Sequence, residues 1–235
     1  MPKNPPQTVI ETHGVGKTFG SGKLAFTALY PTDFSVAAGE LVMIVGPSGS
    51  GKTTLLSILG CVLDATAGQV TVAGQAVAGK SLDALADLRR RSIGFVFQQH
   101  NLLASLTAIE NVEVPLLLEG LGRAARRARA ARALERVGLG DKLRSKPREL
   151  SGGQMQRVAI ARALVSEPSV LLCDEPTAAL DSKTGMTILD LLRELAHERA
   201  RAVVIVTHDP RIFPFADRIV HIEDGRIVDR PGGQP

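Results

Sequence analysis

The segment "GPSGSGKT", residues 46–53, matches the pattern G-x-x-x-x-G-K-[ST] of a phosphate-binding loop. Its glycines let successive backbone N–H groups turn inward around an anion, and the N-terminus of a following helix adds partial positive charge. We expect Lys52 to reach the β- and γ-phosphates of a nucleotide and the Thr53 hydroxyl to bind Mg²⁺. The nucleotide-binding residues predicted here are Gly46, Pro47, Ser48, Gly49, Ser50, Gly51, Lys52, Thr53 and Thr54.

Two carboxylates follow a short apolar run later in the chain. The segment "VLLCDEP", residues 170–176, has the composition of a buried strand and contains Asp174 and Glu175. Ligands of open α/β sheets bind at the carboxyl ends of the strands. We expect Asp174 to bind Mg²⁺ through a water molecule and Glu175 to polarise an attacking water as a general base. The alternative is an ordinary strand end with solvated carboxylates, which a neighbouring phosphate-binding loop makes less favourable.

Two further polar residues end apolar runs and are expected at the same sheet edge. Gln98 follows "RSIGFVF" and is predicted to contact Mg²⁺ and the attacking water, whereas His208 follows "VVIVT" and is predicted to contact the γ-phosphate. Each of them, taken alone, is more often a merely solvated strand end, and it is their expected placement at the edge that holds Asp174 that favours the functional role. The predicted catalytic set is Lys52, Gln98, Glu175 and His208, and the predicted metal ligands are Thr53, Gln98 and Asp174.

A second glycine-containing segment, "LSGGQ" at residues 150–154, begins a helical pattern. Ser151 and Gln154 have the spacing of a capping box. Gly152 and Gly153 remove side chains from the first turn, so that a phosphate can approach bare N–H groups. A well-capped surface helix is the alternative. It does not explain two glycines, each of which costs roughly 1 kcal/mol relative to Ala inside a helix.

The composition limits the class of protein. The chain has 235 residues, of which 44% are hydrophobic, and a formal net charge of +4, which suits an anionic ligand or a membrane surface. Aromatic residues make up only 3%, so we do not expect nucleic-acid binding. The two cysteines lack a CxxC spacing, as in a reduced cytoplasmic protein without structural zinc. The first residues have no secretory signal pattern, and no apolar run reaches the roughly 18 residues of a membrane span.

Apolar runs alternate with helical patterns, which predicts an α/β fold with a mostly parallel sheet covered on both faces. Strands are predicted at residues 8–14, 34–40, 40–46, 91–98, 169–175 and 202–209, and hairpins at 68–79 and 217–228 with the second turning at Asp224-Gly225. Helices are predicted at 52–62, 151–167 and 183–198. Residues 17–26 are expected to form a loop.

The segment from residue 98 to 150 differs in composition, being rich in Ala, Leu and Arg with little strand signal. We interpret it as an inserted helical subdomain. The prediction is one domain over residues 1–235, in which 8–97 and 151–235 form the nucleotide-binding core with its β subdomain.

The motifs together resemble the ATPase subunit of ATP-binding cassette (ABC) transporters. They are "GPSGSGKTT", Gln98, "LSGGQMQR", "VLLCDEP", "AALD" and His208, in that order over nearly the whole chain. The resemblance implies a P-loop NTPase core, an N-terminal antiparallel β subdomain and an inserted α-helical subdomain, with ATP and Mg²⁺ as cofactors. It also implies a head-to-tail dimer of two copies with ATP between them. Ser151, Gly152, Gly153 and Gln154 would then contact the γ-phosphate bound to the other copy, and Asp181 would cross the interface.

The same resemblance assigns further roles. Phe19 would stack on adenine, with core packing as the alternative. The helical subdomain would receive a segment of a membrane permease in a groove formed by Leu102, Leu103 and Leu106, with a private core as the alternative. Arginines 123, 126, 129, 132 and 136 form a stripe on a predicted helix, for which a solvated face is favoured over a lipid or nucleic-acid surface.

Two segments, "LTAIENVEVPLLLEGLG" and "RSIGFVFQQHNLL", resemble the branch of the family that includes macrolide exporters and lipoprotein-release systems. That branch implies an integral membrane permease, a membrane-fusion adaptor and a peripheral location on the cytoplasmic face of the inner (plasma) membrane. "DEPTAALD" departs from the Gly-Asn usual in the branch. The alternatives are a soluble ABC ATPase acting on ribosomes or DNA, and a scaffold module that binds ATP without needing turnover.

Overall fold

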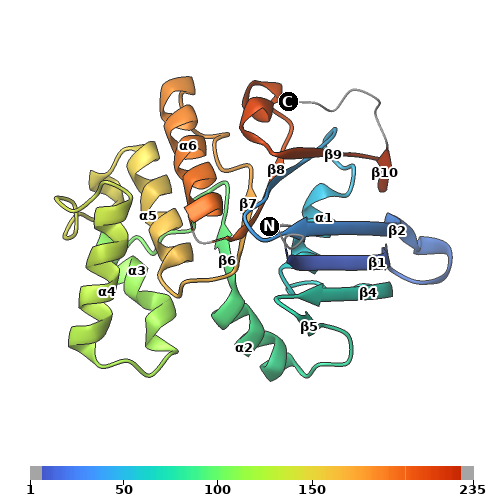
Figure 1. Cartoon of the computed structure of the whole chain (residues 1–235), viewed down its shortest axis with the longest axis horizontal. Helices are drawn as coiled ribbons and strands as arrows, with labels where there is room; N and C mark the ends of the chain where they lie inside the picture. Colours follow the sequence, from blue (N-terminus) through green and yellow to red (C-terminus); the bar gives the residue numbers. More distant parts are fainter. Residues whose placement is uncertain (1–6, 199, 229–235) are drawn as a thin grey trace, which may run out of the picture.

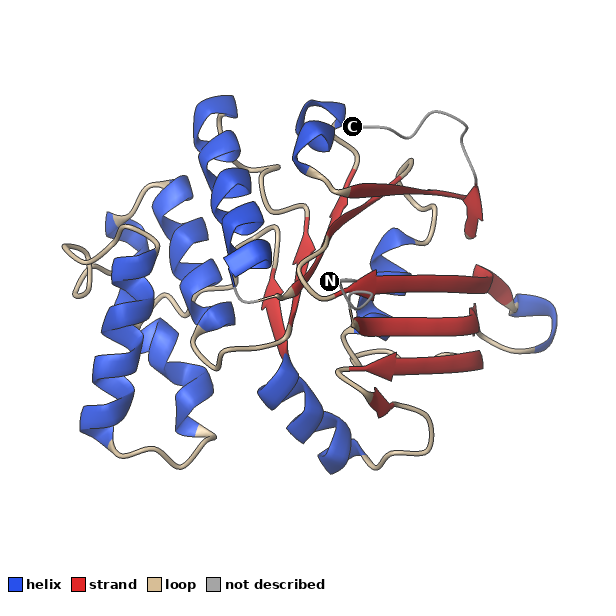
Figure 2. Ribbon diagram, viewed as in Figure 1, coloured by secondary structure: helices blue, strands red, loops and turns tan. Residues whose placement is uncertain are grey.

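The computed structural model of the chain describes residues 7–198 and 200–228, and within these residues the strands form two sheets (Figures 1 and 2). The larger sheet has the strand order β10-β9-β3-β8-β7-β6, and the smaller has the order β2-β1-β4-β5. The strands are β1 (Thr8–Phe19), β2 (Phe26–Ala37), β3 (Leu41–Val45), β4 (Ala67–Val72), β5 (Gln75–Ala76), β6 (Ile93–Val96), β7 (Val170–Asp174), β8 (Ala202–Thr207), β9 (Arg218–Glu223) and β10 (Arg226–Val228).

Strand direction separates the two sheets. In the larger sheet β9, β3, β8, β7 and β6 run parallel, and β10 joins β9 antiparallel. The pairs of the smaller sheet are antiparallel. The predicted α/β fold, with a mostly parallel sheet and an N-terminal antiparallel subdomain, is therefore confirmed. The helices are α1 (Lys52–Leu59), α2 (Leu82–Ser92), α3 (Ala108–Leu117), α4 (Arg123–Arg136), α5 (Gly152–Leu164) and α6 (Ser182–Glu198), and short 3₁₀ helices cover Gly22–Leu24, Pro147–Glu149 and Pro210–Phe215.

Alternate side chains of β3 belong to two hydrophobic cores. Leu41, Met43 and Val45 pack with α3, α4, α5 and α6, whereas Val42 and Ile44 pack with α1 and the smaller sheet. Successive side chains of a strand point to opposite faces, so a strand covered on both faces must be apolar at every position. The larger sheet thus has α3–α6 on one side and α1 with the smaller sheet on the other (Figure 1).

The loop that precedes α3 is fixed by one buried side chain. Asn111 accepts a hydrogen bond from the backbone N–H of Leu103 at 2.8 Å, and its amide nitrogen donates to the carbonyls of Leu103, Leu106 and Thr107. Thr107 and Glu110 form a capping box at the start of α3. Because Asn111 is fully buried, these bonds satisfy an amide that would otherwise destabilise the fold.

The structure departs from the predicted elements in two places. Strands β1 and β2 are longer than expected and take up both ends of the predicted loop 17–26. Pro31 lies inside β2, which is tolerated because β2 is the edge strand of its sheet. The helix α2 was not predicted; only Leu85 and Leu88 of it are buried, so its hydrophobic pattern is weak. The hairpin of β9 and β10 is confirmed, since Asp224 and Gly225 both have positive φ as a two-residue turn requires.

Among the described residues, no helix combines the length and the apolar character that crossing a bilayer requires.

Gly60, at the C-terminal end of α1, is predicted to be essential for packing against β6. A Cβ at this position would overlap the ring of Phe95, which stacks on Phe97 with centroids 5.4 Å apart. We expect Gly60→Ala to lower the free energy of unfolding by about 1–3 kcal/mol in urea denaturation, because overpacking displaces the ring. The matched control is Gly185→Ala in α6, where the added Cβ would lie 3.5 Å from the Cβ of Thr177 in ordinary contact. Equal effects of the two substitutions would contradict the packing explanation.

Candidate functional site

The phosphate-binding loop follows β3 and leads into α1, as predicted. Two of its glycines are needed because the backbone of another strand lies too close to leave room for a side chain. A Cβ at Gly46 would overlap the carbonyl oxygen of Ile222 in β9, and a Cβ at Gly51, which has φ 101°, would lie 2.6 Å from the carbonyl oxygen of Ala28 in β2. The loop therefore passes so close to a strand of each sheet that only glycine fits at these two positions.

The turn of the β9–β10 hairpin links this loop to the smaller sheet. The Gly225 N–H donates to the Ser50 carbonyl at 3.0 Å, and the Gly225 carbonyl accepts from the Tyr30 N–H at 2.8 Å. A Cβ at Gly225 would lie 2.9 Å from the carbonyl oxygen of Ala28. One residue of the hairpin thus holds the loop and β2 in fixed relative positions.

Lys52 is buried at the start of α1 and its ammonium group contacts its own loop. The Nζ atom donates to the carbonyls of Gly46 at 2.8 Å and Pro47 at 2.7 Å. Burial lowers the pKa of Lys52, and the charges of Glu175 and Asp174 oppose that shift. These charges can act on Lys52 because Asp174 and Glu175 lie near the loop, as the sequence predicted.

Asp174 is the last residue of β7 and lies near the Thr53 side chain. Burial and the charge of Glu175 raise the pKa of Asp174, against the opposing effects of Lys52 and of the Thr53 side chain. A cation beside this carboxylate would relieve both unfavourable effects. Residues 7–198 and 200–228 contain no group of three or more His, Cys, Asp or Glu side chains arranged for a metal. One carboxylate and one hydroxyl nevertheless fit Mg²⁺, which keeps several waters and takes phosphate oxygens as ligands.

Glu175 follows β7 in a left-handed conformation, with φ 47°. This conformation is uncommon for a non-glycine residue and is held by the bond from its N–H to the Val206 carbonyl at 3.0 Å. One carboxylate oxygen contacts Nδ1 of His208 at 2.6 Å, and the other accepts from the Thr207 hydroxyl at 3.3 Å. The turn thus brings Glu175 and His208, which are 33 positions apart, into direct contact.

Gln98 lies two residues beyond the end of β6 and is exposed. Because β6 pairs parallel with β7, Gln98 follows the strand next to Asp174 and leaves it at the same sheet edge. The sequence prediction had Gln98 ending the strand itself; in the structure it belongs to the connection that follows.

The segment 150–154 begins α5 with the predicted capping box. The Ser151 N–H donates to Oε1 of Gln154 at 2.9 Å, and the Gln154 N–H donates to the Ser151 hydroxyl at 3.3 Å. The two glycines differ. A Cβ at Gly153 would overlap Cγ2 of Thr184, whereas a Cβ at Gly152 would lie 3.5 Å from Leu180 in ordinary contact. Packing within the chain therefore explains Gly153 and leaves Gly152 unexplained.

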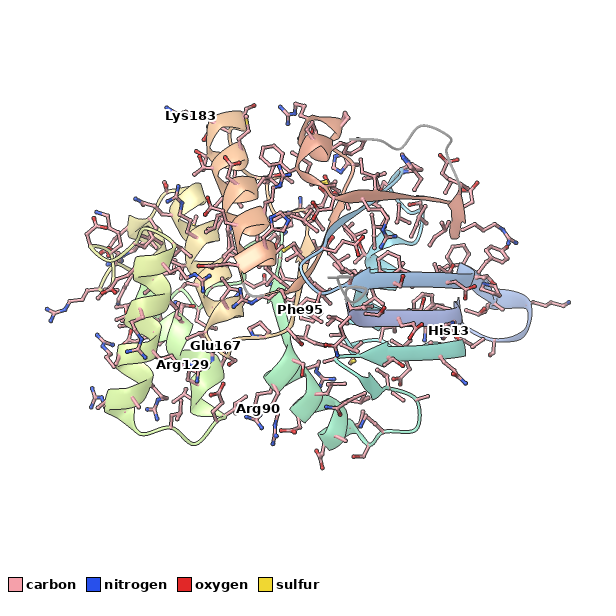
Figure 3. All side chains as sticks on the ribbon, in the orientation of Figure 1. His13, Arg90, Phe95, Arg129, Glu167 and Lys183 are labelled. Carbon is pink, nitrogen blue, oxygen red and sulfur yellow. The ribbon has the colours of Figure 1, made fainter. Side chains whose placement is uncertain are left out.

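Asp181 precedes α6 and bonds within its own chain. Its carboxylate accepts hydrogen bonds from the Thr184 N–H at 3.1 Å and the Thr184 hydroxyl at 2.6 Å. These bonds lower the pKa of Asp181. Lys183, in the same turn, is labelled in Figure 3 at the start of α6.

Above the phosphate-binding loop the surface has a hollow of about 220 Å³, lined by Phe19, Phe26, Ala28 and residues 49–54. Phe19 is the last residue of β1, is 41% exposed and lines the hollow, so it does not pack in the core. Phe26 was not identified from the sequence. The pairing of β1 with β2 places Phe26 beside Phe19. The two short strands predicted from the sequence did not extend to Phe26, so this pairing was not foreseen.

A larger groove, of about 540 Å³, lies between the helical subdomain and the larger sheet. Phe95 and Phe97 line it together with Val114 and Pro115 of α3 and with Leu118, which follows α3. Arg90 of α2 lines it as well; Arg90 and Phe95 are labelled in Figure 3. The further lining arginines are Arg89 and Arg162.

The leucines predicted to receive a permease segment, Leu102, Leu103 and Leu106, are not among the residues that line this groove. Leu102 packs against the core formed with α3–α6, whereas Leu103 is 49% exposed. The hydrogen bonds of Asn111 explain the difference, because they fold residues 103–107 onto α3.

Two arginines of the α4 stripe pair with acidic residues: Arg129 contacts Glu119 at 3.2 Å, and Arg136 contacts Glu198. Arg127, which is not part of the stripe, contacts Glu113 at 3.5 Å. These contacts agree with the interpretation of the stripe as a charged, largely solvated helix face.

Comparisons with known proteins agree on one family. A family model described as ABC transporter matches residues 29–178. The chain is 50% identical over 228 residues to the macrolide export ATP-binding/permease protein MacB 1/2 of Paracoccus denitrificans, covering 97% of this chain and 34% of that protein. It is 46% identical over 226 residues to the uncharacterized ABC transporter ATP-binding protein YknY of Bacillus subtilis, covering 96% of this chain and 98% of that protein. The chain thus spans about a third of the MacB relative and nearly all of YknY.

Solved structures give the same result. The dimeric structure of MJ0796, described as a bacterial ABC transporter cassette, has a TM-score of 0.86 and 44% identity, covering 94% of this chain and 97% of that one. A second dimeric structure of the MJ0796 cassette, in a post-hydrolysis state bound to ADP and Pi, has a TM-score of 0.86 and 43% identity, with the same coverage.

The different reasons for the two glycines of residues 150–154 lead to a prediction. Gly153→Ala is expected to lower the free energy of unfolding by about 1–3 kcal/mol, because the Thr184 side chain is held by Asp181 and cannot move aside freely. Adding Thr184→Ser removes the overlapping methyl but keeps the hydroxyl, so the double variant should recover most of the loss in urea denaturation.

Gly152→Ala is the matched control and should leave the free energy of unfolding unchanged or raise it by up to about 1 kcal/mol, because Ala is favoured over Gly in a helix and its Cβ meets no clash here. If Gly152→Ala is as destabilising as Gly153→Ala, or if Thr184→Ser gives no recovery, the packing explanation is wrong.

Proposed function

Because the chain belongs to the ATP-binding cassette (ABC) transporter family, we propose that it is the ATP-hydrolysing subunit of a membrane complex, coupled to a separate permease. It is an ABC ATPase domain and binds ATP. The observation that carries the proposal is the convergence of the loop residues Lys52 and Thr53 with Asp174 and Glu175 at one sheet edge. This arrangement provides groups for a phosphate chain, a divalent cation and a nucleophilic water in one place.

The residues have distinct roles in this proposal. Lys52 and the loop N–H groups bind the phosphates, and Thr53, Gln98 and Asp174 would hold Mg²⁺, with Asp174 acting through a water. When bound, Mg²⁺ neutralises charge on the phosphate oxygens. Glu175 takes a proton from the attacking water, a contribution of roughly 10²–10⁴-fold in rate. His208, already in contact with Glu175, binds the γ-phosphate.

The second glycine segment serves another copy of the chain. Ser151, Gly152, Gly153 and Gln154 would present the N-terminus of α5 to the γ-phosphate of ATP held by the partner. Asp181 lies at the same end of the helical region and would cross the interface. The dimeric structures of MJ0796 support a dimer for this chain, and an isologous pairing closes with two equivalent sites.

The groove beside α3 is the proposed docking site for the permease. Phe95, Phe97 and the exposed Leu118 form an apolar surface in this groove. Exposing such a surface to water does not stabilise a free monomer, which indicates that a partner covers it. The lining residues include Arg89, Arg90 and Arg162 and no carboxylate. A permease segment with apolar residues flanked by Asp or Glu complements this groove in shape and charge.

The relatives support one type of complex for this chain. MacB of P. denitrificans is named as an ATP-binding/permease protein, and this chain matches a third of it. The proposal is therefore a macrolide-export or lipoprotein-release type of system with a membrane-fusion adaptor, in which the chain lies peripherally on the cytoplasmic face of the plasma membrane. No nucleic-acid partner is proposed. A soluble ATPase acting on ribosomes or DNA and an ATP-binding scaffold are the rivals.

Glu175→Gln tests the catalytic assignment. The variant should lose ATP hydrolysis by roughly 10²–10⁴-fold, because the general base is removed, while ATP binding is retained. Phosphate release measures the first effect and calorimetric titration measures the second. Glu194→Gln, an exposed change on α6, is the matched control. Hydrolysis that persists in Glu175→Gln would remove Glu175 from the mechanism, and preserved function in cells despite lost hydrolysis would favour the scaffold.

Leu118→Asp tests the docking site. Leu118 is 74% exposed in the groove, so the change should leave hydrolysis by the isolated chain within about twofold but greatly reduce the permease recovered with tagged chain from detergent-solubilised membranes. Leu24→Asp, at an 87% exposed position on the β1–β2 connection, is the matched control. A permease recovered equally with both variants would place docking elsewhere, and ribosomes or nucleic acid recovered in its place would refute the transporter proposal.

A further inference from the structure

We propose that Phe26 is a second nucleobase-binding residue, which together with Phe19 forms a two-ring platform for the base of the bound nucleotide. Aromatic residues make up only 3% of this chain. Two of them nevertheless stand exposed at one rim of the nucleotide hollow, Phe26 with 63% and Phe19 with 41% of its surface accessible. Large apolar side chains are normally buried, so a pair left exposed beside a binding site indicates a ligand that covers it.

The strand register places both rings on the same side. Phe19 and Phe26 are direct partners across the antiparallel pair of β1 and β2, and Thr18 pairs with Thr27 in the adjacent position. The two threonine hydroxyls are 3.2 Å apart and hydrogen-bonded. Because neighbouring positions on a strand face opposite sides, this bond on one face of the hairpin orients the two phenylalanines onto the other.

The phosphate-binding loop lies on that other face. Phe26 and Ala28 are two positions apart and both line the hollow with residues 49–54. The Ala28 carbonyl is so close to Gly51 that a Cβ there would lie 2.6 Å from it. The backbone of β2 is therefore fixed against the loop, and Phe26 is held at a constant distance from the phosphates of a bound nucleotide.

One side of the Phe19 ring is already covered. The Lys17 ammonium lies 5.2 Å from the ring centroid in a cation–π contact, and its Nζ donates to the Asp64 carbonyl at 2.6 Å. Lys17 thereby fixes the orientation of Phe19 and leaves its other face for the base. The ring of Phe26 extends the apolar surface in the direction of its strand partner.

Stacking on aromatic rings recognises the π-face of a base and not its edges. Phe26 therefore contributes binding strength to the base and ribose end of the nucleotide and leaves the phosphate contacts unchanged. The proposal assigns ADP and ATP to the platform and excludes ligands that contain phosphate alone.

The test compares ADP with inorganic pyrophosphate, both with Mg²⁺, by isothermal titration calorimetry; neither is a substrate for γ-phosphate hydrolysis. Phe26→Ala should weaken ADP binding by roughly 5- to 50-fold and leave pyrophosphate binding within about twofold. Phe26→Tyr keeps the ring and should bind ADP like the wild-type chain. Leu24→Ala, an exposed apolar change in the same hairpin connection but outside the hollow, is the matched control and should have no effect.

Two results would overturn the proposal. Binding of ADP to Phe26→Ala within twofold of wild type would show that the ring does not contact the base. An equal loss for ADP and pyrophosphate would show that the substitution disturbs the phosphate-binding loop instead. A thermal melt of each variant accompanies the titrations, and a Tm within about 2 °C of wild type is expected because Phe26 is exposed.

Discussion

The close approach of three backbone segments at the phosphate-binding loop is the constraint on which the rest of the structure depends. Gly46 lies against β9, Gly51 lies against β2, and Gly225 bonds to both the loop and β2. These contacts join the two sheets through the loop itself, so the nucleotide site is part of the junction between them. The aromatic rim lines a hollow over residues 49–54 of this loop, and the carboxylates of the sheet edge act on its Lys52, so one fixed loop holds both sets of groups for an anionic ligand.

The alternating cores of β3 extend this arrangement into the body of the protein. Leu41 and Met43 pack toward the helical subdomain, and Val42 and Ile44 pack toward α1 and the smaller sheet. The strand that leads into the phosphate-binding loop is therefore in contact with both halves of the molecule. Gly60 and the stacked rings of Phe95 and Phe97 add a second contact, between the C-terminal end of α1 and the groove beside α3. The nucleotide site and the groove proposed for docking are thus connected by packed elements at both ends of α1.

Much of the fold and site was predictable because it follows from local pattern. Buried parallel strands read as continuous apolar runs, and the polar residues Asp174, Glu175 and His208 follow such runs directly. What was missed depends on contacts that sequence spacing does not contain. The leucines before α3 read as a surface groove, but the side chain of Asn111 folds their loop onto α3. The position of Phe26 depends on the register of β1 with β2, which spacing in the sequence does not show. Too few side chains of α2 are buried for its sequence to show a clear helical periodicity of apolar residues.

The two glycines at residues 152 and 153 differ in what would have to change before each can be replaced. Gly153 is blocked by the Cγ2 methyl of Thr184 in the same chain, whereas a Cβ at Gly152 would make only ordinary contact with Leu180. In evolution, a side chain at position 153 therefore costs the fold less when position 184 changes first or together with it. Positions 153 and 184 are expected to vary together, and position 152 does not depend on position 184 in this way.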